Sequence, residues 1–143
     1  MLFTYRILIN LILILSPLII LFRLLKKKED FKRFKEKLGF FSKNRSKGKL
    51  IWFHGASVGE IKSVIPIIEK LELNSEFKQI LITSNTISSL EIINNLKLKK
   101  TVHQFFPIDA NLLSNKFINF WKPSKVIFID SEIWPNTLQN LNR

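Results

Sequence analysis

An unbroken apolar segment near the start of the chain is the feature that most restricts how this sequence can fold. Residues 7–22 read ILINLILILSPLIILF and carry no charge between Arg6 and Arg23. A helix over these residues extends about 24 Å, which is less than the roughly 30 Å hydrocarbon core of a bilayer. The wider stretch Leu2 to Leu25 would extend about 36 Å, and arginines near helix ends can snorkel. No small-residue cleavage site follows the apolar run, so we predict an uncleaved membrane anchor over residues 1–25.

Two other placements of this helix stay open at the level of the sequence. A helix inserted flat in one leaflet would need a polar face, and this segment has few polar residues. A helix buried in a protein core would need far more chain to cover it on all sides. Pro17 is tolerated in an anchor helix and predicts a kink.

The basic residues form a local collar directly after the apolar segment. Residues 23–49 contain twelve Lys and Arg against three acids, whereas residues 50–143 have a net charge of only +2. Positive charge just past an apolar span marks the cytoplasmic side and attracts anionic lipid surfaces. A nucleic-acid partner is not expected, since the charge does not sit on the folded domain. The apolar residues recur every three or four positions, which predicts an amphipathic juxtamembrane helix within residues 26–48. These apolar residues are Phe31, Phe34, Leu38 and Phe41.

From residue 49 onward, short apolar runs alternate with helical patterns. The predicted strands are residues 50–54, 79–83, 102–106 and 125–130. This alternation predicts an α/β fold with a Rossmann-like parallel sheet over residues 49–143, strand order 3-2-1-4 and helices on both faces. The run VIFI (126–129) predicts a strand covered on both sides. Asp109 is expected to cap the helix that follows it.

Two acidic segments follow strands that this order makes neighbours. They are HGASVGE (54–60) and DSEIWPN (130–136). Ligands collect at the carboxyl ends of parallel strands, so Glu60 and Glu132 are expected to face one cleft and to suit acid–base chemistry. The same spacing, Ser57-x-x-Glu60, also describes a capping box at a helix start.

Two other residues of these segments have both a structural and a functional interpretation. His54 follows a buried strand, so it is interpreted either as a core histidine whose hydrogen bonds are satisfied or as a proton shuttle. Trp134 is either core packing or an amphipathic wall for a sugar or lipid. We read His103, inside a strand, as structural. The chain has no cysteine and only two histidines, so no metal site is expected.

Taken together, these segments resemble the 3-deoxy-D-manno-octulosonic acid (Kdo) transferase family. IWFHGASVGE (51–60) is similar to the IWFHAASVGE-type segment of that family, and DSEIWPN (130–136) to its ETELWPN-type segment. RFKEKLGFF (33–41), TSNTISS (83–89) and FFPID (105–109) are similar to its remaining N-terminal motifs. Gly55 stands where alanine is usual and Ser89 where glycine is usual.

The resemblance implies an inverting glycosyltransferase of the GT-B fold in Gram-negative lipopolysaccharide biosynthesis. Such an enzyme transfers Kdo from CMP-Kdo to lipid IVA, the lipid A precursor, without a metal or a resident cofactor. The implied location is the bacterial inner membrane, with the domain on the cytoplasmic face. The resemblance also implies that CMP-Kdo binds mainly to a C-terminal domain missing after Arg143, so the chain alone is expected to be inactive.

The motif matches also imply roles for single residues. Glu60 would be the general base that takes a proton from a glucosamine hydroxyl, and Glu132 a supporting acid. The residues implied in acceptor binding are Ser57, Gly59, Arg33, Lys37, Thr83, Thr86 and Trp134. Two other functions stay open: a non-catalytic membrane-anchored module that binds anionic lipids, and another GT-B transferase acting on lipid-linked sugars.

Overall fold

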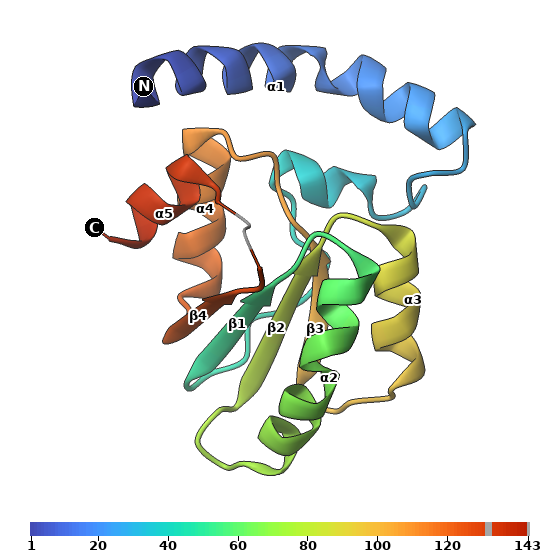
Figure 1. The fold of residues 1–143 in the computed structure, drawn as a ribbon, viewed down its shortest axis with the longest axis vertical. Coiled ribbons are helices and arrows are strands. Elements are labelled where there is room, and N and C mark those ends of the chain that lie inside the picture. The colour runs from blue at the N-terminus through green and yellow to red at the C-terminus, as the bar shows by residue number, and fades with distance from the viewer. Residues whose placement is uncertain (131–132, 143) are drawn as a thin grey trace.

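The computed structural model describes residues 1–130 and 133–142, and it contains a long N-terminal helix followed by an α/β domain (Figure 1). The four strands are parallel in the order β3-β2-β1-β4, which confirms the predicted sheet. The elements in chain order are α1 (Leu2–Leu25), the 3₁₀ helix η1 (Phe34–Leu38), β1 (Leu50–His54), α2 (Val58–Leu73), β2 (Gln79–Ser84), α3 (Ile87–Asn95), β3 (Thr101–Phe105), α4 (Asn111–Trp121), β4 (Lys125–Phe128) and α5 (Pro135–Leu141).

Alternating side chains of the central strands build two apolar layers, one on each face of the sheet. Ile51 and Phe53 of β1 pack with buried residues of α2 and α3 on one face. Leu50 and Trp52 point to the other face, where they pack with Phe117 and Trp121 of α4. Successive residues of a strand point to opposite sides, so a strand that is apolar throughout needs both covers. This arrangement explains why β1 and β2 are buried along their whole length.

Strand β4 is less covered than the run VIFI predicted. Its residues are exposed or half-buried in alternation, and Ile127 is 41% exposed. The physical reason is its place at the edge of the sheet, where β1 is its only neighbouring strand among the residues that the structure describes. The prediction of a doubly covered strand was therefore wrong for β4.

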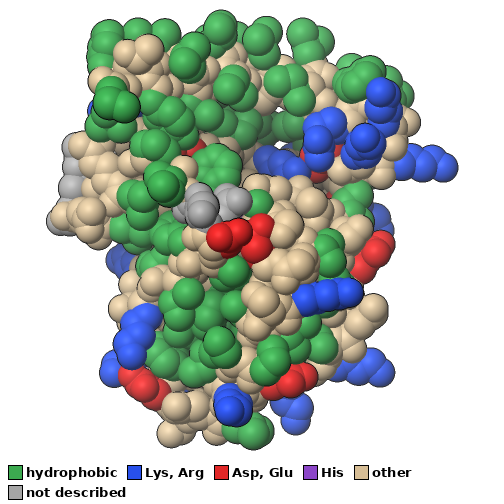
Figure 2. All heavy atoms as spheres, viewed as in Figure 1, with side chains coloured by type: hydrophobic (Ala, Val, Ile, Leu, Met, Phe, Trp, Pro, Cys, Tyr) green, Lys and Arg blue, Asp and Glu red, His purple; other side chains and the backbone are tan. Residues whose placement is uncertain are grey.

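Helix α1 lies along the domain, beyond the carboxyl ends of the strands (Figure 1). Near its start, the Tyr5 hydroxyl donates to Asp109 Oδ2 at 2.8 Å and Arg6 Nε donates to Asn136 Oδ1 at 2.9 Å. At its other end, Arg23 Nε donates to Glu29 Oε1 at 2.5 Å. The helix is long and apolar enough to cross a membrane by length and composition. Its outer side chains form a continuous hydrophobic band along one side of the molecule (Figure 2).

The juxtamembrane segment is not the amphipathic helix that its apolar spacing predicted. Only Phe34–Leu38 is helical, and Gly39 ends it with a left-handed backbone at φ 80°. Phe34 and Leu38 are half-buried, but Phe31 is exposed. The apolar pattern was not followed because Arg33 and Glu36, which the pattern assigns to solvent, turn toward the sheet instead.

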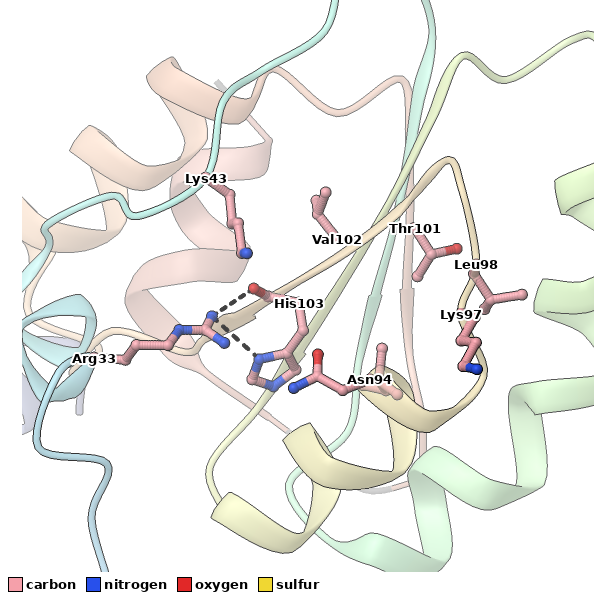
Figure 3. Close-up of a pocket in the computed structure, with 9 residues that line it drawn as sticks. Arg33, Lys43, Asn94, Lys97, Leu98, Thr101, Val102 and His103 are labelled. Carbon is pink, nitrogen blue, oxygen red and sulfur yellow. Dashed lines mark hydrogen bonds between the residues drawn. The ribbon is translucent and has the colours of Figure 1, made fainter.

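Arg33 and Glu36 bind the open edge of β3. Arg33 Nη2 donates to the carbonyl oxygen of His103 at 2.6 Å, as Figure 3 shows, and Phe105 N donates to Glu36 Oε2 at 2.7 Å. The two side chains also bond to each other, with Arg33 Nε 2.7 Å from Glu36 Oε1. An exposed strand edge invites pairing with other chains. The Arg33–Glu36 ion pair thus satisfies some of the backbone hydrogen-bonding groups at the β3 edge, as a fifth strand would.

Candidate active site at the carboxyl ends of the strands

Glu60 lies in the first turn of α2, directly after the loop that leaves β1. Its Oε1 accepts a hydrogen bond from Ser57 Oγ at 2.5 Å, and its Oε2 accepts one from Ala56 N at 2.9 Å. Ser57 Oγ in turn accepts from Glu60 N at 3.2 Å, which confirms the predicted capping box. The side chain folds back onto its helix start but is half-buried rather than sealed from solvent. Each carboxylate oxygen has a further lone pair, so the group can still accept a proton.

The glycines of this loop differ in the space around them. A Cβ at Gly55 would lie 3.0 Å from Ile129 Cδ1 and 3.1 Å from Glu60 Cβ. At Gly59 the nearest atom would be Ser57 Oγ at 3.9 Å. Gly55 is thus crowded behind Glu60, whereas Gly59 lies on an open surface beside Ser57.

The second acidic segment is only partly described. Ser131 and Glu132 lie outside the described residues, so Glu132 and its separation from Glu60 stay a prediction. The strands that lead into the two segments are neighbours, with His54 paired to Phe128. The two segments therefore leave the sheet side by side.

His54 is a core histidine. Its side chain is fully buried, and Nδ1 lies 2.8 Å from Thr83 Oγ1. Burial lowers the pKa of His54 to about 4, with the Thr83 hydrogen bond opposing the shift, so the ring is neutral at pH 7. Thr83 Oγ1 also accepts from Trp52 Nε1 at 2.8 Å. The Thr83 side chain thus lies inside the domain, behind the strand ends.

Thr86 forms the start of α3. Its Oγ1 accepts from Ser89 N at 3.3 Å and lies 2.7 Å from Ser89 Oγ, so Ser89 is buried in a helix cap. A hollow of about 300 Å³ adjoins this cap, and Arg23, Lys27 and Lys28 supply its positive charge. We did not single out these three cations from the sequence; their place directly after the apolar segment was the available signal.

Arg33 and Lys37, the basic residues matched to the family, both have internal acidic partners. Arg33 pairs with Glu36. Lys37 Nζ lies 2.7 Å from Glu29 Oε1 and donates to the carbonyl oxygen of Asn85 at 3.1 Å. Burial lowers the pKa of Lys37, and the carboxylate of Glu29 opposes that shift. Both cations are therefore held below the surface, and sequence reasoning missed the buried acids that hold them.

Asp109 caps α5 rather than α4, so the prediction for this residue was wrong. The cap position of α4 is Ala110, which makes no side-chain cap bond. The buried Asp109 carboxylate accepts from Thr137 N at 2.9 Å, Thr137 Oγ1 at 2.6 Å and Asn136 N at 3.0 Å. Because Tyr5 donates to the same carboxylate, one acid joins α1, the end of β3 and the start of α5.

Trp134 packs on the domain core and also borders a hollow, and its role toward a sugar or lipid stays a prediction. The half-buried ring lies 5.2 Å from the Phe106 ring and 6.0 Å from the His54 ring, centroid to centroid, at the edge of an apolar cluster. The same side chain lines a hollow of about 230 Å³ beneath Ile9 and Ile12 of α1. Within residues 1–130 and 133–142, no group of His, Asp and Glu residues is arranged to hold a metal ion.

The parallel sheet, with helices on both faces, defines a Rossmann-like α/β domain. Polar loops gather at the carboxyl ends of its strands and form a candidate ligand site there. A family model described as 3-deoxy-D-manno-octulosonic-acid transferase (kdotransferase) matches residues 32–143. The chain belongs to this family.

Curated relatives agree with the family match. The chain is 38% identical over 139 residues to a protein of Arabidopsis thaliana named probable 3-deoxy-D-manno-octulosonic acid transferase, mitochondrial. The aligned region covers 95% of this chain and 31% of that relative. The chain is 38% identical over 120 residues to the transferase of Rickettsia bellii, covering 84% of this chain and 29% of the relative. For the Haemophilus influenzae transferase the identity is 31% over 137 residues, with 92% and 32% covered. The chain thus spans about a third of the length of these relatives.

Proposed function

We propose that this chain is the acceptor-side, N-terminal part of an inverting enzyme that transfers Kdo from CMP-Kdo to lipid IVA. The names of its relatives support Kdo transfer. The observation that carries the proposal is the sheet order, which puts the Glu60 loop, the Thr86 loop and the end of β4 at the carboxyl ends of neighbouring parallel strands. CMP-Kdo is bound mainly by a C-terminal domain outside these 143 residues.

Glu60 is the proposed general base. It takes the proton from a glucosamine primary hydroxyl of lipid IVA while that oxygen attacks the anomeric carbon of Kdo, and CMP leaves from the opposite face. The capping box supports this role, because Ser57 Oγ and Ala56 N orient both carboxylate oxygens before the acceptor arrives. We assign Glu132 a supporting role beside the same acceptor.

Exposure divides the proposed acceptor-binding residues into two groups. Ser57, Gly59, Thr86 and Trp134 are exposed or half-buried and are proposed to contact the acceptor. Thr83, Arg33 and Lys37 are held by internal hydrogen bonds or ion pairs, so we propose that they shape the site from behind. The acceptor's phosphates are then placed near the cations that border Thr86, namely Arg23, Lys27 and Lys28.

The contacts of α1 support a helix that lies in the membrane interface rather than across the bilayer. Tyr5 near one end and Arg23 near the other both bond to residues outside the helix, and a helix of this length extends about 36 Å. While both contacts persist, the helix runs along the domain. Its opposite side exposes Phe3, Ile14 and Leu18 to an apolar environment. We therefore propose attachment to the cytoplasmic face of the bacterial inner membrane through this band (Figure 2).

The complete enzyme with Glu60→Gln tests the catalytic proposal. We expect transfer of Kdo to lipid IVA to fall by about 10²–10⁴-fold, the usual contribution of a positioned general base. The matched control is Ser57→Ala, which removes both hydrogen bonds of the Ser57 hydroxyl to Glu60 but keeps the carboxylate and its bond to Ala56 N, so it should keep far more activity than Glu60→Gln. Turnover by Glu60→Gln at the normal rate would refute the assigned base.

A further inference from the structure

The hollow beneath α1 is a cavity with no role assigned so far. It has a volume of about 230 Å³ and lies between the helix and the carboxyl edge of the sheet. Ile9 and Ile12 of α1 contribute to one wall, and Phe106, Pro107 and Trp134 contribute to the other. Its lining is therefore mostly hydrocarbon and aromatic.

The charged groups in the lining are already satisfied by the protein. Lys37 binds Glu29 and the carbonyl oxygen of Asn85. The carboxylate of Asp109 accepts hydrogen bonds from Tyr5 and from two residues of α5. An occupant thus contacts apolar surface and has no charge to neutralise. An apolar occupant would gain dispersion contacts with the walls of the hollow.

Polar contacts at both ends of α1 keep this hollow from collapsing. Besides its bond to Asn136, Arg6 donates through Nη2 to Gln139 Oε1 at 2.6 Å, which ties the start of the helix to α5. The far end is tied by Arg23 to Glu29, which also holds Lys37. The helix is therefore held at both ends, and Ser16 and Ile20 between them are buried, while the hollow lies beneath Ile9 and Ile12.

The outer side of the same helix indicates what fills the hollow. Leu8 and Leu11, which flank Ile9 along the helix, are more than half exposed, as is Leu18 further along it. Such a surface is stable in hydrocarbon rather than in water, so the proposed membrane attachment would surround α1 with lipid tails. We propose that the hollow is an acyl-chain site, which takes one hydrocarbon chain of a membrane lipid between α1 and the sheet edge. The inference rests on the membrane attachment proposed for α1, and on the proposed transfer reaction for identifying that lipid as the acceptor.

Tryptophan quenching tests the site in the full 143-residue chain. The purified chain in detergent micelles is titrated with a phosphatidylcholine brominated on its acyl chains. Trp134 lines the hollow, whereas Trp52 and Trp121 are fully buried in the core. We expect saturable quenching that disappears in Trp134→Phe. Equal quenching in that variant would overturn the proposal.

A pair of matched substitutions on α1 separates entry into the hollow from mere contact with the micelle. Ile12→Phe places a larger side chain at the hollow, and Ile14→Phe makes the same change at a position that is 74% exposed. We expect Ile12→Phe to weaken the quenching several-fold and Ile14→Phe to leave it unchanged. The same quenching in both variants would overturn the acyl-chain site.

The readout is independent of Kdo transfer. Quenching that persists in Glu60→Gln, together with the loss of activity in that variant, supports both the acyl-chain site and the catalytic proposal. Transfer that proceeds normally in Ile12→Phe with unchanged quenching refutes the acyl-chain site and leaves the proposed function standing.

Discussion

Single side chains at the strand ends combine structural and chemical roles. Ser57 and Glu60 close the first turn of α2, and the same bonds aim the Glu60 carboxylate. Trp134 packs on the apolar cluster and also lines the hollow beneath α1. If the proposed function holds, a substitution here changes stability and activity together, so the two effects must be measured separately.

Loss of the Ser57 hydroxyl is expected to lower the free energy of unfolding by about 1 kcal/mol, the usual cost of removing a serine cap. The measurement is urea unfolding of Ser57→Ala in detergent, followed by circular dichroism. The matched control is Ser63→Ala on the same helix, where alanine is favoured in a helix interior and no loss is expected. Equal losses in both variants would contradict a stabilising cap.

The two buried histidines predict a loss of stability in mild acid. Burial lowers the pKa of His54 to about 4, and burial together with the charges of Arg33 and Lys43 lowers the pKa of His103 to about 3. Below about pH 6.5 these two histidines therefore bind protons in the unfolded chain but stay neutral in the folded chain. Stability is full above pH 6.5 and falls as the pH drops toward 4, by about 1.4 kcal/mol per pH unit for each histidine.

Unfolding free energies at pH 7, 6 and 5 measure this slope. In His103→Gln one histidine no longer titrates, so the slope should lose about half of its histidine contribution. A slope unchanged in that variant would show that His103 does not cause the acid sensitivity.

Sequence reasoning reached the local bonds of the site but not the distant ones. The spacing of Ser57 and Glu60 predicts the capping box because both partners lie within one turn. Asp109 caps a helix 26 residues further on, at Pro135, and no local pattern reports that contact. Arg33 and Lys37 looked available for phosphates because the sequence does not show that Glu36 and Glu29, although nearby in the chain, are buried.

At the level of elements, the Arg33–Glu36 pair replaces a neighbouring strand for β3. The pair supplies one donor and one acceptor to the strand edge, and it is largely buried. Removing one partner of a buried pair leaves an uncompensated charge, which costs more than the pair itself contributes. Loss of either Arg33 or Glu36 is thus expected to destabilise the edge of β3.

Glu36→Gln is expected to lower the free energy of unfolding by about 3 kcal/mol, because Arg33 loses its countercharge inside the protein. The control is Glu76→Gln, which breaks the exposed pair with Lys49 and should cost less than about 1 kcal/mol. Urea unfolding of both variants at pH 7 gives the comparison. Similar costs for the two pairs would show that burial does not strengthen the role of Glu36.

The element pattern was predictable where apolar periodicity and tertiary environment agree. The strands followed from apolar runs that are buried on both faces, as in β1 and β2, and their order followed from the common order of doubly wound sheets. The prediction was wrong for the segment around Phe31 because polar bonds to β3 decided its conformation. It was also wrong for β4 because an apolar run does not reveal which strand forms the edge.

For the whole molecule, the orientation of α1 decides how the domain meets a membrane. A spanning helix would place Thr4 and Lys27 on opposite sides of the bilayer, whereas a helix docked along the domain places both on one side. The chain has no native cysteine, so single cysteines can report the side without interference.

We expect Thr4→Cys and Lys27→Cys to react with a membrane-impermeant maleimide from the same, cytoplasmic side of sealed inner-membrane vesicles. Both positions are exposed in the structure. Lys70→Cys, exposed on α2, marks the side on which the domain lies. Labelling of Thr4→Cys from the side opposite to Lys70→Cys would establish a spanning helix.

The ties between α1 and the far end of the chain also set the order of events during synthesis. Tyr5 and Arg6 leave the ribosome well before their partners Asp109 and Asn136, which are translated more than 100 residues later. The nascent apolar helix therefore emerges before the domain on which it docks. Docking is consequently a late step of biogenesis, and until then the proposed membrane attachment would shield the helix from aggregation.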